Sequence, residues 1–126
     1  MALQAGADYV RFNPADSLGW QLWSEAYNQT SLCLFQQGHV QEAIDQARAG
    51  TELEHDSRNT SGIPGNIYYA WANLARWETL RGNREAAEKA FQESRRCGAV
   101  LIRQMQLGPD FALLVKVGDV ELENRM

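Results

Sequence analysis

The sequence predicts an all-α protein built from repeated pairs of helices. Gly38 and Gly82 lie 44 residues apart, and the segments around them share one pattern of aromatic, small and core residues. On both sides of each glycine, apolar residues recur at intervals of three and four, which is the spacing of an amphipathic helix. A glycine between two such stretches is typical of the end of one helix and the start of the next. A fixed internal period of this kind indicates stacked helix-turn-helix repeats.

Length and composition agree with a single domain over residues 1–126. Of the 126 residues, 44% are hydrophobic, so the chain can bury a core without disulfide or metal cross-links. The formal net charge is −4. Because nucleic-acid binding draws on clustered Lys and Arg, this acidic balance argues against a nucleic-acid partner.

Residues 1–15 form an N-terminal segment that is expected to be irregular or to be the end of an earlier helix. Pro14, followed by Asp16 or Ser17 as an oxygen-bearing cap, predicts the start of the first long helix. A ladder of apolar and small residues continues this helix to a point just before Gly38.

The second helix is predicted from Val40 to about Glu54, and it completes a first repeat over residues 16–55. A dense run of turn-forming residues then occupies positions 56–65 and separates the two repeats.

The second repeat is predicted over residues 66–107. Its first helix spans about Asn66 to Arg81, and its second begins near Asn83, whose side chain can cap it.

The last part of that second helix predicts a further element. Val100, Leu101 and Met105 would be exposed to water unless something covers them, and burying a side chain of this size contributes about 1.5–3 kcal/mol. Residues 110–125 are therefore predicted to be a C-terminal capping helix, although the valines in this segment also permit a strand.

A family resemblance is carried mainly by the second repeat. The residues that carry it are Trp71, Ala72, Asn73, Leu74, Ala75, Gly82, Ala87, Phe91 and Ser94. They resemble the tetratricopeptide repeat, and residues 27–53 resemble a weaker copy. Repeats of that family run about 34 residues, so the period here is longer. The resemblance implies two repeats plus a capping helix, stacked as a short right-handed superhelix.

The resemblance also implies a binding surface. In that family the first helix of each repeat lines a concave groove that holds an extended peptide or a partner helix, so a protein–protein interaction module is expected. Carried over to this chain, the groove-facing residues are Asn28, Leu32 and Phe35 in the first repeat, Tyr69, Ala72, Asn73, Arg76 and Thr79 in the second, and Lys116 on the closing helix. Asn28 and Leu32 occupy the positions where co-chaperone members carry a carboxylate clamp, so that clamp is absent.

A structural role is the alternative expectation. The chain has four tryptophans and four tyrosines, which is more than two repeats require. Aromatic residues are favoured at interfaces, so one or two of them are expected to face a partner. The same surplus fits a homodimer, or a spacer or regulatory domain of a larger polypeptide with no separate ligand.

The residues offer little for catalysis. His39 and His55 stand alone at expected loop edges, with no second histidine or cysteine at metal-ligand spacing. No serine sits in a nucleophile elbow, and no glycine-rich loop precedes a lysine. We therefore expect no enzyme activity, no metal and no cofactor.

Cys33 and Cys97 fall in predicted helices at positions that continue an apolar ladder, so both are expected to be free, buried thiols, as in a reducing compartment. No stretch approaches the ~20 apolar residues of a bilayer span, so membrane insertion is not expected. Without a basic and then apolar leader, a cytoplasmic location is expected.

Overall fold

The computed structural model describes residues 2–60 and 63–105, and these residues are all-α, as the sequence predicts. The elements in chain order are α1 (Ala2–Phe12), α2 (Ser17–Gln36), α3 (Val40–Thr51), the short 3-10 turn η1 (Glu52–His55), α4 (Pro64–Leu80) and α5 (Arg84–Met105). The predicted capping helix over residues 110–125 lies outside the described residues. None of the helices in the described ranges combines the length and the apolar character needed to cross a membrane.

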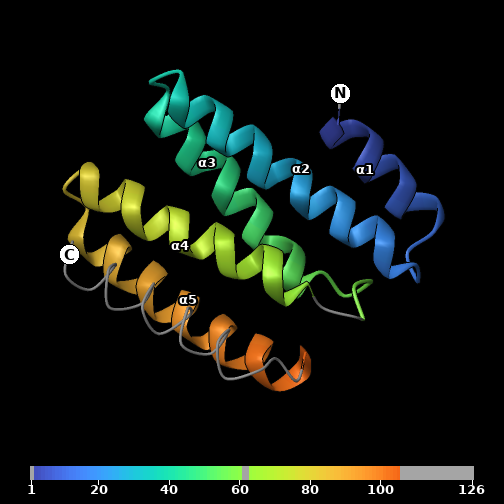
Figure 1. Ribbon diagram of the computed structural model, residues 1–126. Helices are drawn as coiled ribbons and strands as arrows, with labels where there is room; N and C mark the ends of the chain where they lie inside the picture. The colour runs from blue at the N-terminus through green and yellow to red at the C-terminus, as the bar shows by residue number, and fades with distance from the viewer. Residues whose placement is uncertain (1, 61–62, 106–126) are drawn as a thin grey trace.

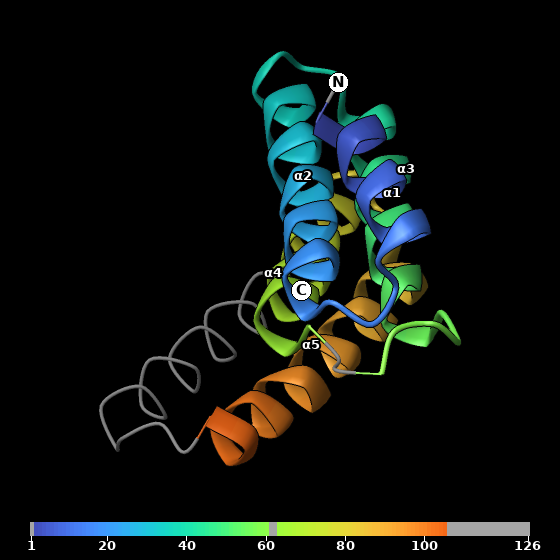
Figure 2. The same cartoon turned by 90° about the vertical axis from the view of Figure 1, so that its right-hand side faces the viewer.

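The helices stack in chain order, with each one packed against the next (Figure 1). Helix α2 also contacts α4, so the two pairs α2–α3 and α4–α5 lie against each other along their length. Figure 2 shows α1 beside α2 and in front of α3, at the end of the described stack.

The turns that join the helices of each pair, α2 to α3 and α4 to α5, have the same backbone conformation and hydrogen bonds. Gly38 and Gly82 have φ angles of 85° and 78°, in the left-handed region that glycine adopts without steric cost. In both turns the amide after the glycine donates to the carbonyl four residues before the glycine, with N···O distances of 2.9 Å. The glycine amide itself donates to the carbonyl three residues before it, at 3.0 and 3.1 Å. This hydrogen-bond pattern is the Schellman motif that ends α-helices, here repeated 44 residues apart.

The core is buried in two neighbouring clusters. One joins the α2–α3 pair to the α4–α5 pair, and it consists of Ala43, Ile44, Ala47, Ala72, Leu74, Ala75, Trp77, Ala90 and Phe91. The other lies toward α1 and consists of Val10, Trp20, Leu53, Ile63, Ile67 and Cys97. Some core positions 44 residues apart are buried in both helical pairs: Ala43 and Ala87 are buried, as are Ala47 and Phe91.

Helices α2 and α3 approach closely at Gly50. A methyl group on Gly50 would lie 2.9 Å from Cβ of Tyr27, which is closer than real Cβ atoms approach one another. The equivalent residue in the second pair, Ser94, is also small and fully buried. A small residue of the repeated pattern therefore stands where α2 and α3 approach closely.

The N-terminal segment is a helix, so the expectation of an irregular segment is wrong and the alternative of a helix is confirmed. Helix α1 packs closely on α2 at Gly6, where an added Cβ would lie only 2.9 Å from Cα of Trp23. The side chain of Asp16 accepts from the backbone amide of Leu18 and caps α2, as predicted. The indole of Trp20 donates to the carbonyl of Pro14 at 2.8 Å and fastens the corner between α1 and α2.

The two cysteines differ. Cys97 is buried and free, and burial raises the pKa of its thiol to about 12. Cys33 is free but exposed, so the prediction that it is buried is wrong. It follows buried Ser31 by two residues, which turns its side chain by about 200° around the helix, away from the buried stripe.

Candidate functional site

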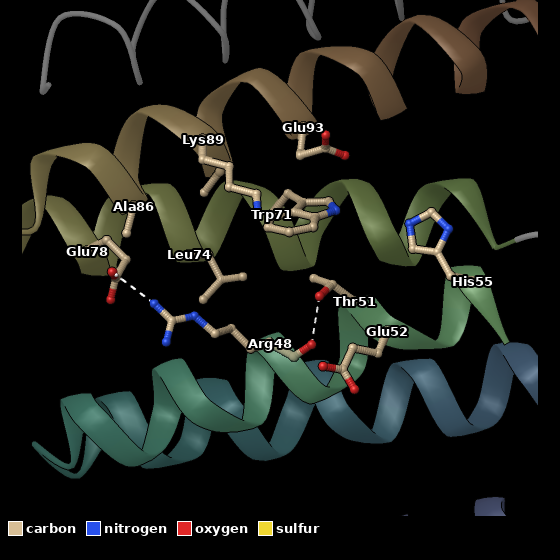
Figure 3. Close-up of a pocket in the computed structure, with 11 residues that line it drawn as sticks. Arg48, Thr51, Glu52, His55, Trp71, Leu74, Glu78, Ala86, Lys89 and Glu93 are labelled. Carbon is tan, nitrogen blue, oxygen red and sulfur yellow. Dashed lines mark hydrogen bonds and ion pairs between the residues drawn. The ribbon is translucent and has the colours of Figure 1, made fainter.

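A cleft of about 570 Å³ lies between α3 and α5, with one face of α4 as its floor (Figure 3). The lining residues are Arg48 and Thr51 of α3, Glu52 and His55 of η1, Trp71, Leu74 and Glu78 of α4, and Ala86, Lys89, Ala90 and Glu93 of α5. The three residues of α4 are spaced at three and four, so they share one side of that helix.

Glu78 is a buried charge on the cleft floor, and its side chain is only 2% exposed. Its Oε2 accepts from Nη2 of Arg48 at 3.1 Å and from Nδ2 of Asn83 at 3.4 Å. Its other oxygen, Oε1, is buried and has no hydrogen-bond partner among the described residues. The side chain of Arg48 is half-exposed and reaches Glu78 from the solvent side. It pairs with Oε2 and leaves Oε1 without a partner.

Trp71 forms the other end of the floor. Its ring is half-buried and packs against the core, as the resemblance implies, but its Nε1 is buried without a partner. Within residues 2–60 and 63–105, three buried side-chain polar atoms have no hydrogen-bond partner; two belong to the cleft-lining residues Trp71 and Glu78, and the third is Oγ of Ser94. Leaving a buried donor or acceptor unpaired costs about 1–3 kcal/mol. Both unpartnered atoms of these two residues are therefore candidates for a hydrogen bond to a ligand.

The charges around the mouth nearly balance. Glu52 and Lys89 are exposed on opposite walls, and Glu93 pairs with Nη2 of Arg96 at 2.8 Å. Lys89 reaches from α5 toward Trp71, while Arg48 reaches from α3 to Glu78 (Figure 3). A cleft with charges of both signs suits a polar but uncharged group better than a highly charged one.

The predicted groove residues lie elsewhere on the molecule. Tyr69, Asn73 and Arg76 share one side of α4. Trp71, which lines the cleft, follows Tyr69 by two residues and therefore points to the opposite side of the helix. The side that carries Tyr69 thus faces away from the cleft. Tyr69 is 59% exposed and Leu32 is 44% exposed, so both are accessible.

Others of the predicted set are tied into the fold. Asn28 donates from Nδ2 to the carbonyl of Asn66 at 3.0 Å and so joins α2 to α4. Phe35 is half-buried and stacks on Trp77, with ring centroids 5.0 Å apart. Ala72 is 3% exposed and lies in the core.

Three predicted residues remain, namely Asn73, Thr79 and Lys116. Asn73 is half-buried and accepts from Nη1 of Arg76 at 3.5 Å. The hydroxyl of Thr79 donates to the carbonyl of Ala75 within α4. Lys116 lies outside the described residues.

Sequence reasoning missed Arg48, Glu78 and Lys89 as members of a site. One signal was available, because Glu78 stands 44 residues after Leu34, so that the second pair carries a charge where the first carries an apolar residue. A carboxylate at a position that the repeat pattern assigns to the interior is the feature that distinguishes the second pair.

Within the part of the chain that the structure describes, no three His, Cys, Asp or Glu side chains come together in a way that could hold a metal ion. Comparison with protein-family models, with curated proteins and with solved structures finds no match for this chain.

Proposed function

We propose that the protein is a protein–protein interaction module of the tetratricopeptide type and that it holds a segment of its partner in the cleft between α3 and α5. The observation that carries the proposal is a cleft lined by two residues, Trp71 and Glu78, that each have a buried polar atom without a partner, Nε1 and Oε1. The proposal moves the binding surface from the side of α4 that carries Tyr69 to the opposite side.

The repeated structure supports the family part of the proposal. The glycine turns at Gly38 and Gly82 have the same hydrogen bonds, and core alanines 44 residues apart, Ala43 and Ala87, are buried in both pairs. Two such pairs, continued by a capping helix over residues 110–125, would form a short right-handed superhelix. Modules built from stacked repeats present extended surfaces that suit partner binding.

Binding is favoured over catalysis because the titratable groups of the cleft are engaged in ion pairs or stand in solvent. Arg48 pairs with Glu78, and Nε2 of exposed His55 lies 3.4 Å from Oε1 of Glu54. The net charge of −4 opposes a nucleic-acid partner. We place the protein in the cytoplasm because Cys33 is an exposed free thiol, which is typical of a reducing compartment.

The test is a selection of binding peptides followed by blocking of the cleft. Random linear peptides and helix-stapled peptides are selected on the wild-type protein, and each is then measured on Ala86→Trp, which fills the cleft from α5. Glu42→Trp is the matched control, because Glu42 occupies the equivalent position of the first pair, where its side chain is 69% exposed. We expect Ala86→Trp to lose binding and Glu42→Trp to keep it. Equal binding by both variants would refute the cleft as the site.

An apolar surface on α1 and α2 favours a second candidate function, namely self-association or stacking on another domain. Its exposed side chains are Tyr9, Phe12, Leu18 and Leu22. Two of them, Tyr9 and Leu22, line a groove of about 490 Å³ between these helices. The solution mass separates the candidates. A dimer that Leu22→Lys converts to a monomer would support this second role.

A further inference from the structure

We propose that two copies of the chain associate through α1, which packs antiparallel on α1 of the other copy and places Phe12 of each copy in the groove between α1 and α2 of the other. This inference rests on the second candidate function, self-association, and is independent of the cleft between α3 and α5. It names the occupant of the apolar surface and the contacts that hold it.

The exposed apolar side chains gather at one end of the molecule. The described residues include seven large apolar side chains that are exposed, and four of them belong to α1 and the first half of α2. Phe12 is 75% exposed, more than any of the others. Within the described residues α1 packs chiefly on α2, so its other side faces solvent (Figure 2). Apolar surface that is gathered in one place is typical of a contact with another molecule.

Helix α1 carries small residues at one end and aromatic residues at the other. Ala2, Ala5, Tyr9 and Phe12 follow one another at intervals of three, four and three, so they share one side of the helix. The first three of them, together with Gly6, line the groove of about 490 Å³ between α1 and α2. The small end of the helix therefore leaves a hollow, and the other end carries a projecting phenyl ring.

An antiparallel pair of α1 helices brings the hollow of each copy to the ring of the other. With the two-fold axis at Tyr9, Phe12 lies three residues past the axis and therefore opposite Gly6 and beside Ala5 of the other copy. Two-fold symmetry makes the same contact twice, and it requires a surface that is complementary to itself. A contact with a different protein has no such requirement. The complementary ends of α1 therefore favour a second copy as the occupant.

Asp8 and Arg11 add charge complementarity to the same contact. Both side chains are exposed, and within residues 2–60 and 63–105 neither pairs with an opposite charge. Asp8 accepts from Nε2 of Gln4, and the guanidinium of Arg11 lies over the ring of Phe12. With the axis at Tyr9, Asp8 of each copy lies within one residue of the position opposite Arg11 of the other. Exposed ion pairs contribute little energy, but they set the register of an interface.

Tyr9, at the axis, is already held in place by α2. Its hydroxyl donates to Oδ2 of Asp16. Its ring lies against Gly19, where an added Cβ would come within 2.5 Å of Cδ1 of Tyr9. A side chain that is already ordered loses little rotamer freedom when a second copy packs on it, which lowers the cost of association.

The experiment measures the mass of the protein in solution by sedimentation velocity over a range of concentrations. The wild type is expected to change from monomer to dimer as the concentration rises. Phe12→Lys should raise the dissociation constant of the dimer about a hundredfold or more, because two phenyl rings lose their burial in each dimer. Leu80→Lys is the matched control and should dimerise as the wild type does. Leu80 is 69% exposed and lies at the end of α4, outside the contact.

A charge exchange tests the antiparallel arrangement itself. Asp8→Arg makes both positions of the charged contact positive, and Arg11→Asp makes both negative. Each variant alone should dimerise about tenfold more weakly than the wild type, because like charges then meet twice. An equimolar mixture should form heterodimers as readily as the wild type forms homodimers, since every contact again joins opposite charges. Native mass spectrometry identifies the heterodimers, because the two variants differ in mass.

The other outcomes separate this proposal from the earlier ones. A wild type that stays monomeric at every concentration refutes the α1 contact together with the second candidate function. A dimer that Phe12→Lys leaves intact, or a mixture that stays as weak as its two components, refutes the α1 contact while self-association stands. Melting curves show that each variant is folded, and recovery in the mixture cannot come from unfolded chains. The cleft is tested separately by Ala86→Trp.

Discussion

Arg48 and Glu78 form an ion pair between the two helical pairs, with Nη2 and Oε2 3.1 Å apart. Arg48 belongs to α3 and Glu78 to α4, thirty residues later in the chain. The side chain of Glu78 is 2% exposed, while that of Arg48 is 50% exposed. The pair therefore holds a buried charge at the joint between the pairs, and it also sets which oxygen of Glu78 remains free in the cleft.

Replacing Arg48 with Met should destabilise the protein by about 2 kcal/mol. Removing one partner leaves the buried carboxylate of Glu78 uncompensated, which costs about 3–5 kcal/mol for fully buried pairs and less here because Arg48 is half-exposed. Urea unfolding measures the change. The double variant Arg48→Met with Glu78→Leu should recover most of the loss, since no buried charge remains. A single variant as stable as the wild type would contradict the role of the pair.

Replacing Gly38 or Gly82 with Ala should cost about 1 kcal/mol each, because both have positive φ angles that an alanine adopts only with strain. Gly65 is the control. It lies in α4 with open space around it, so Gly65→Ala should stabilise the protein by about 0.5–1 kcal/mol. Thermal unfolding of the three variants measures both signs. Stabilisation by Ala at the two turn positions would argue against the Schellman turns.

Gly50→Ala should destabilise the protein by about 1–3 kcal/mol, although alanine is the better helix former. The added methyl would lie 2.9 Å from Cβ of Tyr27, an atom that cannot move without moving the backbone of α2. Denaturant unfolding gives the value. A gain in stability like that expected at Gly65 would mean that α2 and α3 do not meet closely at this residue.

Alkylation should separate the two cysteines. Burial raises the pKa of Cys97 to about 12, so at mildly alkaline pH its thiol stays protonated and covered. Cys33 is exposed, so iodoacetamide should modify it in the native protein and should modify both residues only after unfolding. Mass spectrometry of the labelled peptides checks this. Rapid labelling of native Cys97 would contradict its burial.

The sequence predicted best those features that depend on a few neighbouring residues. Gly38 and Gly82 could be assigned to turns because a glycine between two amphipathic stretches favours a positive φ angle and a helix end. Cys33 was misplaced because a long helix with apolar residues on several sides does not reveal from its spacing alone which side is buried.

Local sequence patterns could not predict the cleft. Arg48 and Glu78 are brought together by the packing of α3 on α4, and no spacing rule relates residues thirty positions apart. The family resemblance directed attention to the side of α4 that carries Tyr69, whereas the unpartnered atoms lie on the opposite side. Only the charge of Glu78 at the position equivalent to Leu34 pointed to the cleft.

The indole N–H resonance of Trp71 in a proton–nitrogen correlation spectrum tests the central claim most directly. Addition of a selected linear peptide should shift this resonance downfield, because its free donor gains a carbonyl partner. The indole of Trp20, which already donates to Pro14 at 2.8 Å, should not move and serves as the internal control. If the Trp71 resonance stays in place while the backbone amides of Tyr69, Asn73 and Arg76 shift, the cleft between α3 and α5 is not the binding site.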